Sequence, residues 1–377
     1  MIPKRLLKID NFLNFISIEL AFSRVNPINV RSELLKFNKT KANPIFEYKP
    51  DSEYLSTIKG ILSEIKLGDS PVEKLLEKKR KDLIKKIRFI NAIGTPDFTR
   101  RSMTIYPPPN EKLVELAYQL LKLPPSKKQK KILRKDARAM IRLAFKTLGF
   151  NWRLLNKDLI TSARVNPLKQ TLELRKKERF SEKYVRRLIV HEIGTHAVRA
   201  ENGRLQPLLV FLHGLPGYLE TEEGLAAYSE YLTGVLDNST LRNYAGRVAA
   251  IHHALSHDFL STYKHMKKFF RDKIAWKLTL RAKRGLKDTS LPGAYTKDVI
   301  YLRGFLAVKK YIQKGGDITK LYVGKIGLKD VPLLTKIPGI VKPKFLPFTL
   351  FVNESITHDV PLPETKQEEK IKEELKK

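Results

Sequence analysis

The feature that most constrains this chain is a pair of histidines flanking a glutamate, in the segment His191-Glu192-Ile193-Gly194-Thr195-His196. The surrounding residues 185–198 are apolar on almost every side, which predicts a helix buried in the protein. Metallopeptidases hold zinc and activate water with two histidines and a glutamate on one helix. The segment therefore predicts a metal site in the interior of the fold.

The spacing of the two histidines departs from the usual H-E-x-x-H, which separates them by four residues. Here the separation is five. At about 100° per residue, five steps place two side chains about 140° apart, against about 40° for four steps. Both histidines can bind one metal only if the helix is locally widened. We expect a π-bulge at Gly194-Thr195, a distortion that clusters at functional sites.

A catalytic zinc takes three protein ligands and leaves a fourth position for water. The chain has no cysteine, so the third ligand must be an aspartate, a glutamate or a histidine. A helix predicted about one loop after the motif carries Glu220, Glu222 and Glu223. Glu223 is the preferred candidate, and spacing alone leaves the other two open. Glu192 is the natural general base, which takes a proton from the attacking water and passes it to the leaving amine.

Plainer interpretations of the histidines compete with metal binding. His191 and His196 could each satisfy a hydrogen bond in the core, but the glutamate between them and the glutamate-led helix behind them favour the metal site. A second group, His252, His253 and His257, has i,i+4 spacing between its last two members. It lacks an obvious third ligand or base, so we interpret it as helix surface or packing.

The composition favours an anionic partner. The 377 residues carry 73 Lys and Arg against 39 Asp and Glu, a net charge of +34. Such an excess suits an acidic polypeptide, a membrane surface or nucleic acid, or reflects lysines that simply coat the helices. No apolar run reaches the roughly 18–20 residues that span a bilayer, which predicts no membrane insertion. Polar residues break the first apolar segment, which predicts no signal peptide, and the lack of cysteine fits a cytoplasmic location.

Helix and turn signals predict one catalytic domain with an N-terminal extension. Residues 1–50 are expected to form a helical arm, at about 4–23, and an extended segment; residues 51–350 form the catalytic domain, and 361–377 a charged, disordered tail. Ser70 caps a helix that ends near Gly94, and Asn110 caps one that ends near residue 123. A loop is expected at 95–109, and further helices at about 127–149, 181–203, 221–234, 239–256, 258–271, 273–284 and 296–313.

The strongest β signal comes directly before the motif helix. Residues 159–165 and 171–174 are short extended runs, joined through the turn Asn166-Pro167-Leu168-Lys169. They predict a small antiparallel hairpin beside that helix.

These motifs resemble the microtubule-associated tyrosine carboxypeptidase family, whose bacterial relatives are labelled QEGLA-motif proteins. Residues 191–203 are similar to its H-E-x-x-x-H…R-x-x-N-G segment, and residues 222–226 to Q-E-G-L-A, with Glu222 in place of the glutamine. Residues 296–304, with Arg284-Gly285 before them, are similar to T-K-D-x-x-Y-x-x-G. The resemblance covers roughly residues 40–350.

The resemblance implies an α+β, mainly helical, gluzincin-like metallopeptidase with a small antiparallel hairpin or sheet beside the active-site helix. It implies one Zn²⁺ held by His191, His196 and Glu223, with Glu192 as the base. Family members of known activity remove a C-terminal tyrosine from an acidic tubulin tail. The difference at Glu222 leaves the ligands unchanged but bears on substrate choice.

A carboxypeptidase also needs a strand edge for the peptide backbone and a cation for the terminal carboxylate. The hairpin is expected to supply the edge. The candidate cations, in order of preference, are Arg199, Arg164, Lys297 and Arg303, each equally able to be a structural ion-pair partner. Asn202 is predicted to contact substrate, and Tyr301 to hydrogen-bond the tetrahedral intermediate or to pack in the core.

The leading prediction is a cytoplasmic zinc carboxypeptidase that acts on the C-terminus of an acidic peptide or protein. A second prediction keeps zinc but has the enzyme cut internal peptide or amide bonds. A third is a non-enzymatic regulatory or nucleic-acid-binding protein on a metallopeptidase scaffold, with nucleic acid bound only through non-specific basic charge. The intact set of histidines and glutamates favours the enzymes.

Overall fold

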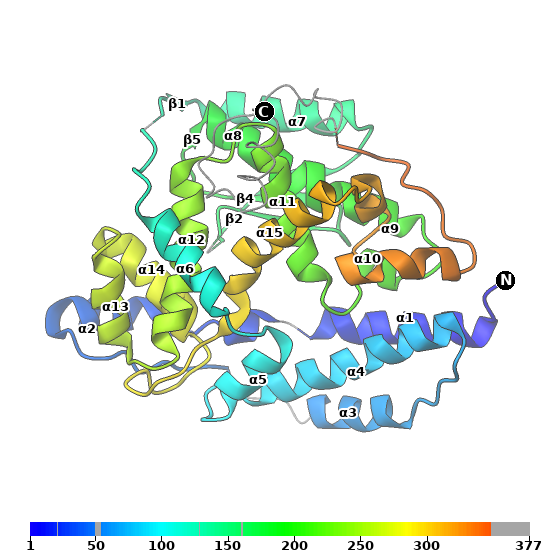
Figure 1. Cartoon of the computed structure of the whole chain (residues 1–377), viewed down its shortest axis with the longest axis horizontal. Helices are drawn as coiled ribbons and strands as arrows, with labels where there is room; N and C mark the ends of the chain where they lie inside the picture. Colours follow the sequence, from blue (N-terminus) through cyan, green and yellow to red (C-terminus); the bar gives the residue numbers. More distant parts are fainter. Residues whose placement is uncertain (21, 50–53, 128, 160, 348–377) are drawn as a thin grey trace, which may run out of the picture.

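In the described part of the chain, apolar stripes form helices that pack in two hydrophobic clusters. Two small sheets accompany these helices (Figure 1). The computed structural model describes residues 1–377 except 21, 50–53, 128, 160 and 348–377. The predicted mainly helical α+β class is confirmed. The predicted tail at 361–377 lies outside the described residues. The α-helices are α1 (Lys4–Glu19), α2 (Val30–Thr40), α3 (Tyr54–Glu64), α4 (Pro71–Asn91), α5 (Phe98–Ile105), α6 (Glu111–Leu121), α7 (Arg134–Thr147), α8 (Glu182–Leu188), α9 (Val198–Arg204), α10 (Val210–His213), α11 (Tyr218–Leu232), α12 (Asn238–Ala254), α13 (Phe259–Lys267), α14 (Asp272–Lys283) and α15 (Ile300–Gln313).

Shorter helical turns connect these elements: η1 (Phe22–Val25), η3 (Thr296–Val299), η4 (Ile318–Tyr322) and η5 (Leu328–Lys336). The N-terminal helices α1, α3, α4 and α5 lie along one side of the molecule (Figure 1). Residues 1–50 contribute to both clusters, since Leu13 of α1 lies in one and Phe37 of α2 in the other. The division at residue 50 stays a prediction. Within the described part of the chain, no helix is both long and apolar enough to cross a bilayer.

The sheet next to the motif helix has the strand order β2-β4-β3. Strands β3 (Ala163–Asn166) and β4 (Thr171–Arg175) pair antiparallel, which confirms the predicted hairpin. Strand β2 (Arg153–Lys157) pairs parallel with β4, so the expectation of a purely antiparallel sheet is wrong. Strand β3 is an edge strand and packs against the helix that carries the motif. A separate pair joins β1 (Lys131–Ile132) to β5 (Phe180–Ser181).

Several predicted boundaries needed correction. The arm helix stops at Glu19, short of 23, and α5 occupies the expected loop at 95–109. The helix expected from residue 127 begins only at Arg134, because residues 131–132 pair with β5. Gly203 does not end its helix; a Cβ there would lie 2.3 Å from the Phe211 carbonyl oxygen, so glycine lets α10 approach α9.

The histidine motif lies in a π-helix, η2 (Ile189–Ala197), which continues α8 without a break and leads into α9. The predicted widening between the histidines is therefore confirmed, and it extends over two turns. Ser181 caps the start of this run by accepting a hydrogen bond from the Tyr184 amide. Helix α11 packs against η2 on one side and against α15 on another.

Candidate metal centre and active site

The side chains of His191, His196 and Glu223 converge on one point. One ligand atom of each lies within 4.8 Å of the other two. The Nε2 atom of His191 lies 3.6 Å from Oε2 of Glu223. The π-helix makes this possible, because it turns His196 back towards His191 on the side facing α11. Of the three glutamates that spacing left open, Glu223 is the one that converges with both histidines, whereas Glu222 contacts only His196, at Nδ1.

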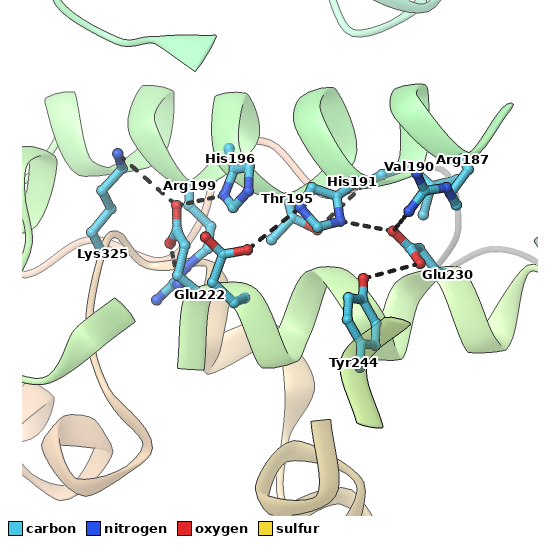
Figure 2. A network of polar contacts seen from close by, with 11 residues as sticks. Arg187, Val190, His191, Thr195, His196, Arg199, Glu222, Glu230, Tyr244 and Lys325 are labelled. Carbon is cyan, nitrogen blue, oxygen red and sulfur yellow. Dashed lines mark hydrogen bonds and ion pairs between the residues drawn. The ribbon is translucent and has the colours of Figure 1, made fainter. Parts of the chain in front are cut away.

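A buried glutamate of α11 forms a hydrogen bond with the Nδ1 atom of each histidine, on the side of the ring away from Nε2 (Figure 2). His191 Nδ1 lies 2.8 Å from Glu230 Oε1, and His196 Nδ1 lies 2.8 Å from Glu222 Oε1. Glu230 and Glu222 are 0% and 2% exposed. Because a carboxylate can only accept, each Nδ1 carries the proton. Each Nε2 atom then faces the candidate metal centre, where a metal ion can take the place of a proton.

Cations compensate the two supporting carboxylates. Glu230 is 3.5 Å from Arg187 Nη1, and it accepts a hydrogen bond of 3.5 Å from the Tyr244 hydroxyl. Glu222 pairs with Arg199 and lies 3.9 Å from Lys325 Nζ.

These pairings set the charge state of the site. Burial opposes the protonated form of His191, but hydrogen bonds with Glu223 and Glu230 outweigh it and raise its pKa to about 10. Burial likewise opposes the ionised form of Glu222, but Arg199, Lys325 and His196 lower its pKa to about 2. The carboxylates around the histidines therefore stabilise a positive charge, such as a proton or a metal ion, at the point where the two Nε2 atoms and Glu223 converge.

These donors fit a zinc ion. Two imidazole nitrogens and one carboxylate are a catalytic zinc set, and two ligands of a tetrahedral zinc lie about 3.4 Å apart. The 3.6 Å between His191 and Glu223 agrees with that geometry. Histidines hydrogen-bonded to carboxylates are the usual support of such ligands. A core histidine pair would need no third converging carboxylate.

Glu192 follows His191 directly and is only partly buried. Among the described residues its carboxylate makes no hydrogen bond or ion pair. A carboxylate that is adjacent to the ligands and not held by another group is free to accept a proton, as a general base must.

Two predicted substrate contacts are instead internal supports. Arg199 is 0% exposed. Its three guanidinium nitrogens donate hydrogen bonds to Glu222 and to the carbonyl oxygens of Gly324 and Ile326. Asn202 is also buried, and both ends of its amide bond the backbone of Phe345, at 2.7 and 2.9 Å. Arg199 thus lies beside the candidate metal centre, but its side chain has no exposed surface with which to contact substrate.

The remaining candidates differ in how they are placed. Arg164 pairs with Glu173 across the hairpin and keeps 58% of its side chain exposed. Arg303 pairs with Glu220 at 2.7 Å and with the Pro107 carbonyl.

Lys297 lies on η3, and Tyr301 lies on α15, the helix that packs against α11. Burial opposes the ionised form of Glu223, but the hydrogen bond with His191 and the charges of His196, His191 and Lys297 outweigh it and lower the pKa of Glu223. Burial, to which the charge of Glu223 adds, raises the pKa of Tyr301 to about 12. Within the described chain, neither the Lys297 ammonium nor the Tyr301 hydroxyl has a hydrogen-bonding partner.

A cavity of about 300 Å³ opens beside β3. Lys325, which also approaches Glu222, is part of its wall and links it to the metal ligands. The cavity is lined by Ser17, Ile18, Arg164, Val165, Asn166, Pro167, Leu168, Leu212, His213 and Lys325.

The second histidine group is a stack. The rings of His253 and His257 are 3.9 Å apart, and those of His253 and His265 are 4.4 Å apart. Within the described residues, the three-residue groups with metal-binding spacing do not include these histidines. The interpretation as packing therefore fits the geometry.

Two supporting residues escaped the sequence analysis. Glu230 lies seven residues after Glu223, and seven residues are two helical turns, so the pair shares one face of α11. That spacing could have revealed it. Lys325 belongs to an irregular segment between η4 and η5, and no local pattern marks it.

The fold and site together define a mainly helical α+β protein with a candidate two-histidine, one-glutamate metal centre. The family model described as microtubule-associated tyrosine carboxypeptidase matches residues 35–356. The chain therefore belongs to this family.

Named relatives match over a shorter region. Microtubule-associated tyrosine carboxypeptidase 1 of Rattus norvegicus is 32% identical over 171 residues, 41% of this chain and 36% of the relative. The putative tyrosine carboxypeptidase MATCAP2 of Homo sapiens is 32% identical over 158 residues, 41% of this chain and 30% of the relative. The match thus spans about a third of the length of these relatives.

Proposed function

We propose that this protein is a zinc-dependent metallopeptidase that removes a C-terminal residue from a peptide or protein tail. The observation that carries the proposal is the convergence of His191, His196 and Glu223, with a buried carboxylate behind each histidine. The names of its relatives, tyrosine carboxypeptidases, support action at a C-terminus.

In the proposed reaction, Glu192 removes a proton from the attacking water and then donates it to the leaving amine. Bound zinc would act as a Lewis acid that lowers the pKa of water to about 7 and polarises the scissile carbonyl. Burial raises the pKa of Tyr301 to about 12, so its phenol stays protonated and can donate a hydrogen bond to the developing oxyanion. Glu230 and Glu222 keep the two imidazoles in the required tautomer.

The body of the substrate would lie along β3. Among the described strands, β3 pairs only with β4, so its other edge can take an extended peptide, and the cavity beside it can take side chains. Arg164 and Lys325 give that cavity a positive wall, which suits acidic residues upstream of the cleaved bond. An acidic protein tail is therefore the proposed substrate, and the microtubule-associated relatives fit a reaction in the cytoplasm.

The test uses the purified full chain, stripped with a chelator and reloaded with zinc. It is incubated with peptides that vary at the C-terminal residue, and the products are identified by mass spectrometry. Wild type should release single C-terminal residues, while Glu192→Gln and the zinc-free protein release none. Internal cuts would instead favour an endopeptidase or amidase. Zinc binding without any cleavage would favour the non-enzymatic alternative.

A further inference from the structure

Helix α1 forms part of the wall of the cavity beside β3, although it lies outside the region that the family model matches. That model begins at residue 35, whereas α1 spans Lys4–Glu19. Ser17 and Ile18, near the end of α1, line the cavity together with residues of the β3–β4 hairpin and of α10. Helix α1 packs against α4 and α10 (Figure 1). The cavity is therefore completed by an element that the family match does not cover.

A buried carboxylate fixes the position of α1 against α10. Asp10 is 1% exposed and accepts hydrogen bonds from the backbone amides of Leu209 and Val210, where α10 begins. The Asn14 side chain, one turn further along α1, donates to the same carboxylate at 2.7 Å. A buried carboxylate that loses its donors is costly. The contact therefore holds α1 in one register along α10.

A buried lysine anchors the end of α1 that reaches the cavity. Lys79 of α4 is 0% exposed, and its Nζ atom donates hydrogen bonds to Ser17 Oγ at 3.1 Å and to the Gly214 carbonyl oxygen at 2.8 Å. Ser17 lines the cavity, and Gly214 directly follows His213, which lines it too. A buried ammonium group needs such acceptors. Ile18 is thus presented to the cavity by an anchored helix end, and a pre-organised wall of this kind favours selective binding.

The cavity combines apolar side chains with cations. Ile18 and Leu168 are large aliphatic residues that stay 42% and 50% exposed, and both line it. Single exposed apolar side chains are ordinary, but two that line one cavity of about 300 Å³ are typical of a ligand pocket. Arg164 and Lys325 line the same cavity. Such a wall suits a peptide segment in which an apolar side chain stands next to acidic ones.

The cavity adjoins the candidate metal centre on the side of His196. Lys325 Nζ, in the cavity wall, lies 3.9 Å from Oε1 of Glu222, and the same oxygen lies 2.8 Å from His196 Nδ1. Residues 164–166 of the edge strand β3, which packs against η2, line the cavity as well. A peptide that pairs with β3 while its end lies over the candidate metal centre would therefore place an upstream side chain in the cavity.

We propose that Ile18 of α1 is a specificity-determining residue, which together with Leu168 binds a large apolar side chain of the peptide upstream of the cleaved bond. The proposal rests on the proposed carboxypeptidase function and narrows its substrate class to acidic tails that carry a leucine, isoleucine or phenylalanine at one position. Arg164 and Lys325 bind acidic residues next to that position. A serine or glycine in its place gains nothing from Ile18, because it brings little apolar surface to bury.

The experiment measures binding rather than turnover. The zinc-loaded full chain with Glu192→Gln is titrated into fluorescent peptides of glutamate and glycine, in which a single leucine is moved through successive positions before the C-terminus. One position should bind about 10-fold more tightly than the peptide without leucine, as expected for burying much of a leucine side chain. Adding Ile18→Ser should remove most of this gain, and Leu168→Ser should reduce it.

Phe15→Ser is the matched control on the same helix. Phe15 is 52% exposed and is not among the described residues that line the cavity, so this variant should keep the leucine preference. A preference that survives Ile18→Ser, or one lost equally in Phe15→Ser, would overturn the proposal. The same holds if every leucine peptide binds like the parent peptide. Circular dichroism checks folding, and if Ile18→Ser does not fold, a preference that survives Leu168→Ser is the contrary result.

Failure of the proposed catalysis gives a different pattern. If wild type releases no C-terminal residue but the leucine preference still depends on Ile18, the peptidase function is wrong and the subsite remains. If wild type releases residues but shows no leucine preference, the subsite alone is wrong.

Discussion

At the scale of single residues, Glu230 fixes the tautomer and the orientation of His191, a proposed metal ligand. Its carboxylate is fully buried and accepts the Nδ1 proton of His191 at 2.8 Å. Replacing it with glutamine keeps the shape but removes the charge that fixes and polarises the imidazole. We expect Glu230→Gln to weaken zinc binding about 10- to 100-fold, the usual effect of losing such a support. Competition with a fluorescent chelator measures the affinity.

Glu220 provides the matched control on the same helix. It is one of the glutamates that spacing left open as a ligand, and it pairs with Arg303 instead. Glu220→Gln should leave zinc affinity unchanged. A loss of zinc in Glu220→Gln equal to that in Glu230→Gln would mean that the ligand assignment is wrong.

His253 offers a prediction of pH dependence. Burial, followed by the neighbouring rings of His265 and His257, lowers its pKa to about 4, below the value of about 6.5 in an unfolded chain. Between these values the unfolded state binds more protons, so the free energy of unfolding falls as the pH drops from 6.5 to 4. After a discount for its solvent exposure, we expect about 1 kcal/mol from this residue. In urea unfolding, the free energy of unfolding of His253→Gln should fall less between pH 6.5 and 4 than that of wild type. The same fall in both proteins would contradict the prediction.

Residue identities in the site were predictable where chemistry and spacing act locally. The histidines, Glu192 and Glu223 belong to two adjacent helices with recognisable patterns. Arg199 was expected to bind substrate because position along the helix does not reveal that the segment 323–327 covers it. Lys325 reaches the site only through tertiary packing of a distant segment.

At the scale of elements, the separation of five residues between His191 and His196 was enough to predict the widened helix. Two converging ligands five positions apart in an α-helix point about 140° away from each other, and the wider turn of the π-helix removes this divergence. Strand β2 was missed because Arg153-Leu154-Leu155-Asn156-Lys157 has no clean alternation, and its side chains stay exposed or half-buried. Backbone pairing with the distant β4 is what makes it a strand. Helix α5 was missed because its sequence, Phe98–Ile105, is short and lies between turn signals.

The crossing of α11 and α15 gives a prediction at this scale. A Cβ on Gly304 would lie 2.1 Å from the Glu220 carbonyl oxygen, so the two backbones touch. Gly304→Ala must push α15 away from α11, which carries Glu223. We expect a loss of roughly 1–3 kcal/mol in the free energy of unfolding, as for other overpacked sites, together with weaker zinc binding.

Gly60 is the control for this substitution. It lies in α3, where an added Cβ would meet no atom within 4 Å. Gly60→Ala should stabilise the protein by about 0.5–1 kcal/mol through helix propensity. Denaturant unfolding of both variants, followed by circular dichroism, gives the comparison. If both substitutions changed the free energy of unfolding equally, the backbones of α11 and α15 would not be in close contact at Gly304.

At the scale of the whole molecule, the helical class was predictable from apolar periodicity, whereas the grouping of helices was not. Phe37 of the N-terminal arm packs against Phe259, Tyr263 and Trp276, which belong to the distant helices α13 and α14. Such contacts depend on which helices become neighbours in the folded protein. Periodicity in one segment carries no information about its partner.

The net charge of +34 leads to a prediction for the molecule as a whole. If the charge serves to attract an acidic substrate, association with an acidic peptide should be fast at low ionic strength and fall steeply with salt. We expect kcat/KM for an acidic peptide to fall roughly tenfold or more between 50 and 500 mM salt. A neutral peptide with the same terminal residue should change little. If both peptides respond alike, the lysines only coat the surface, and selection for an acidic tail must come from the site alone.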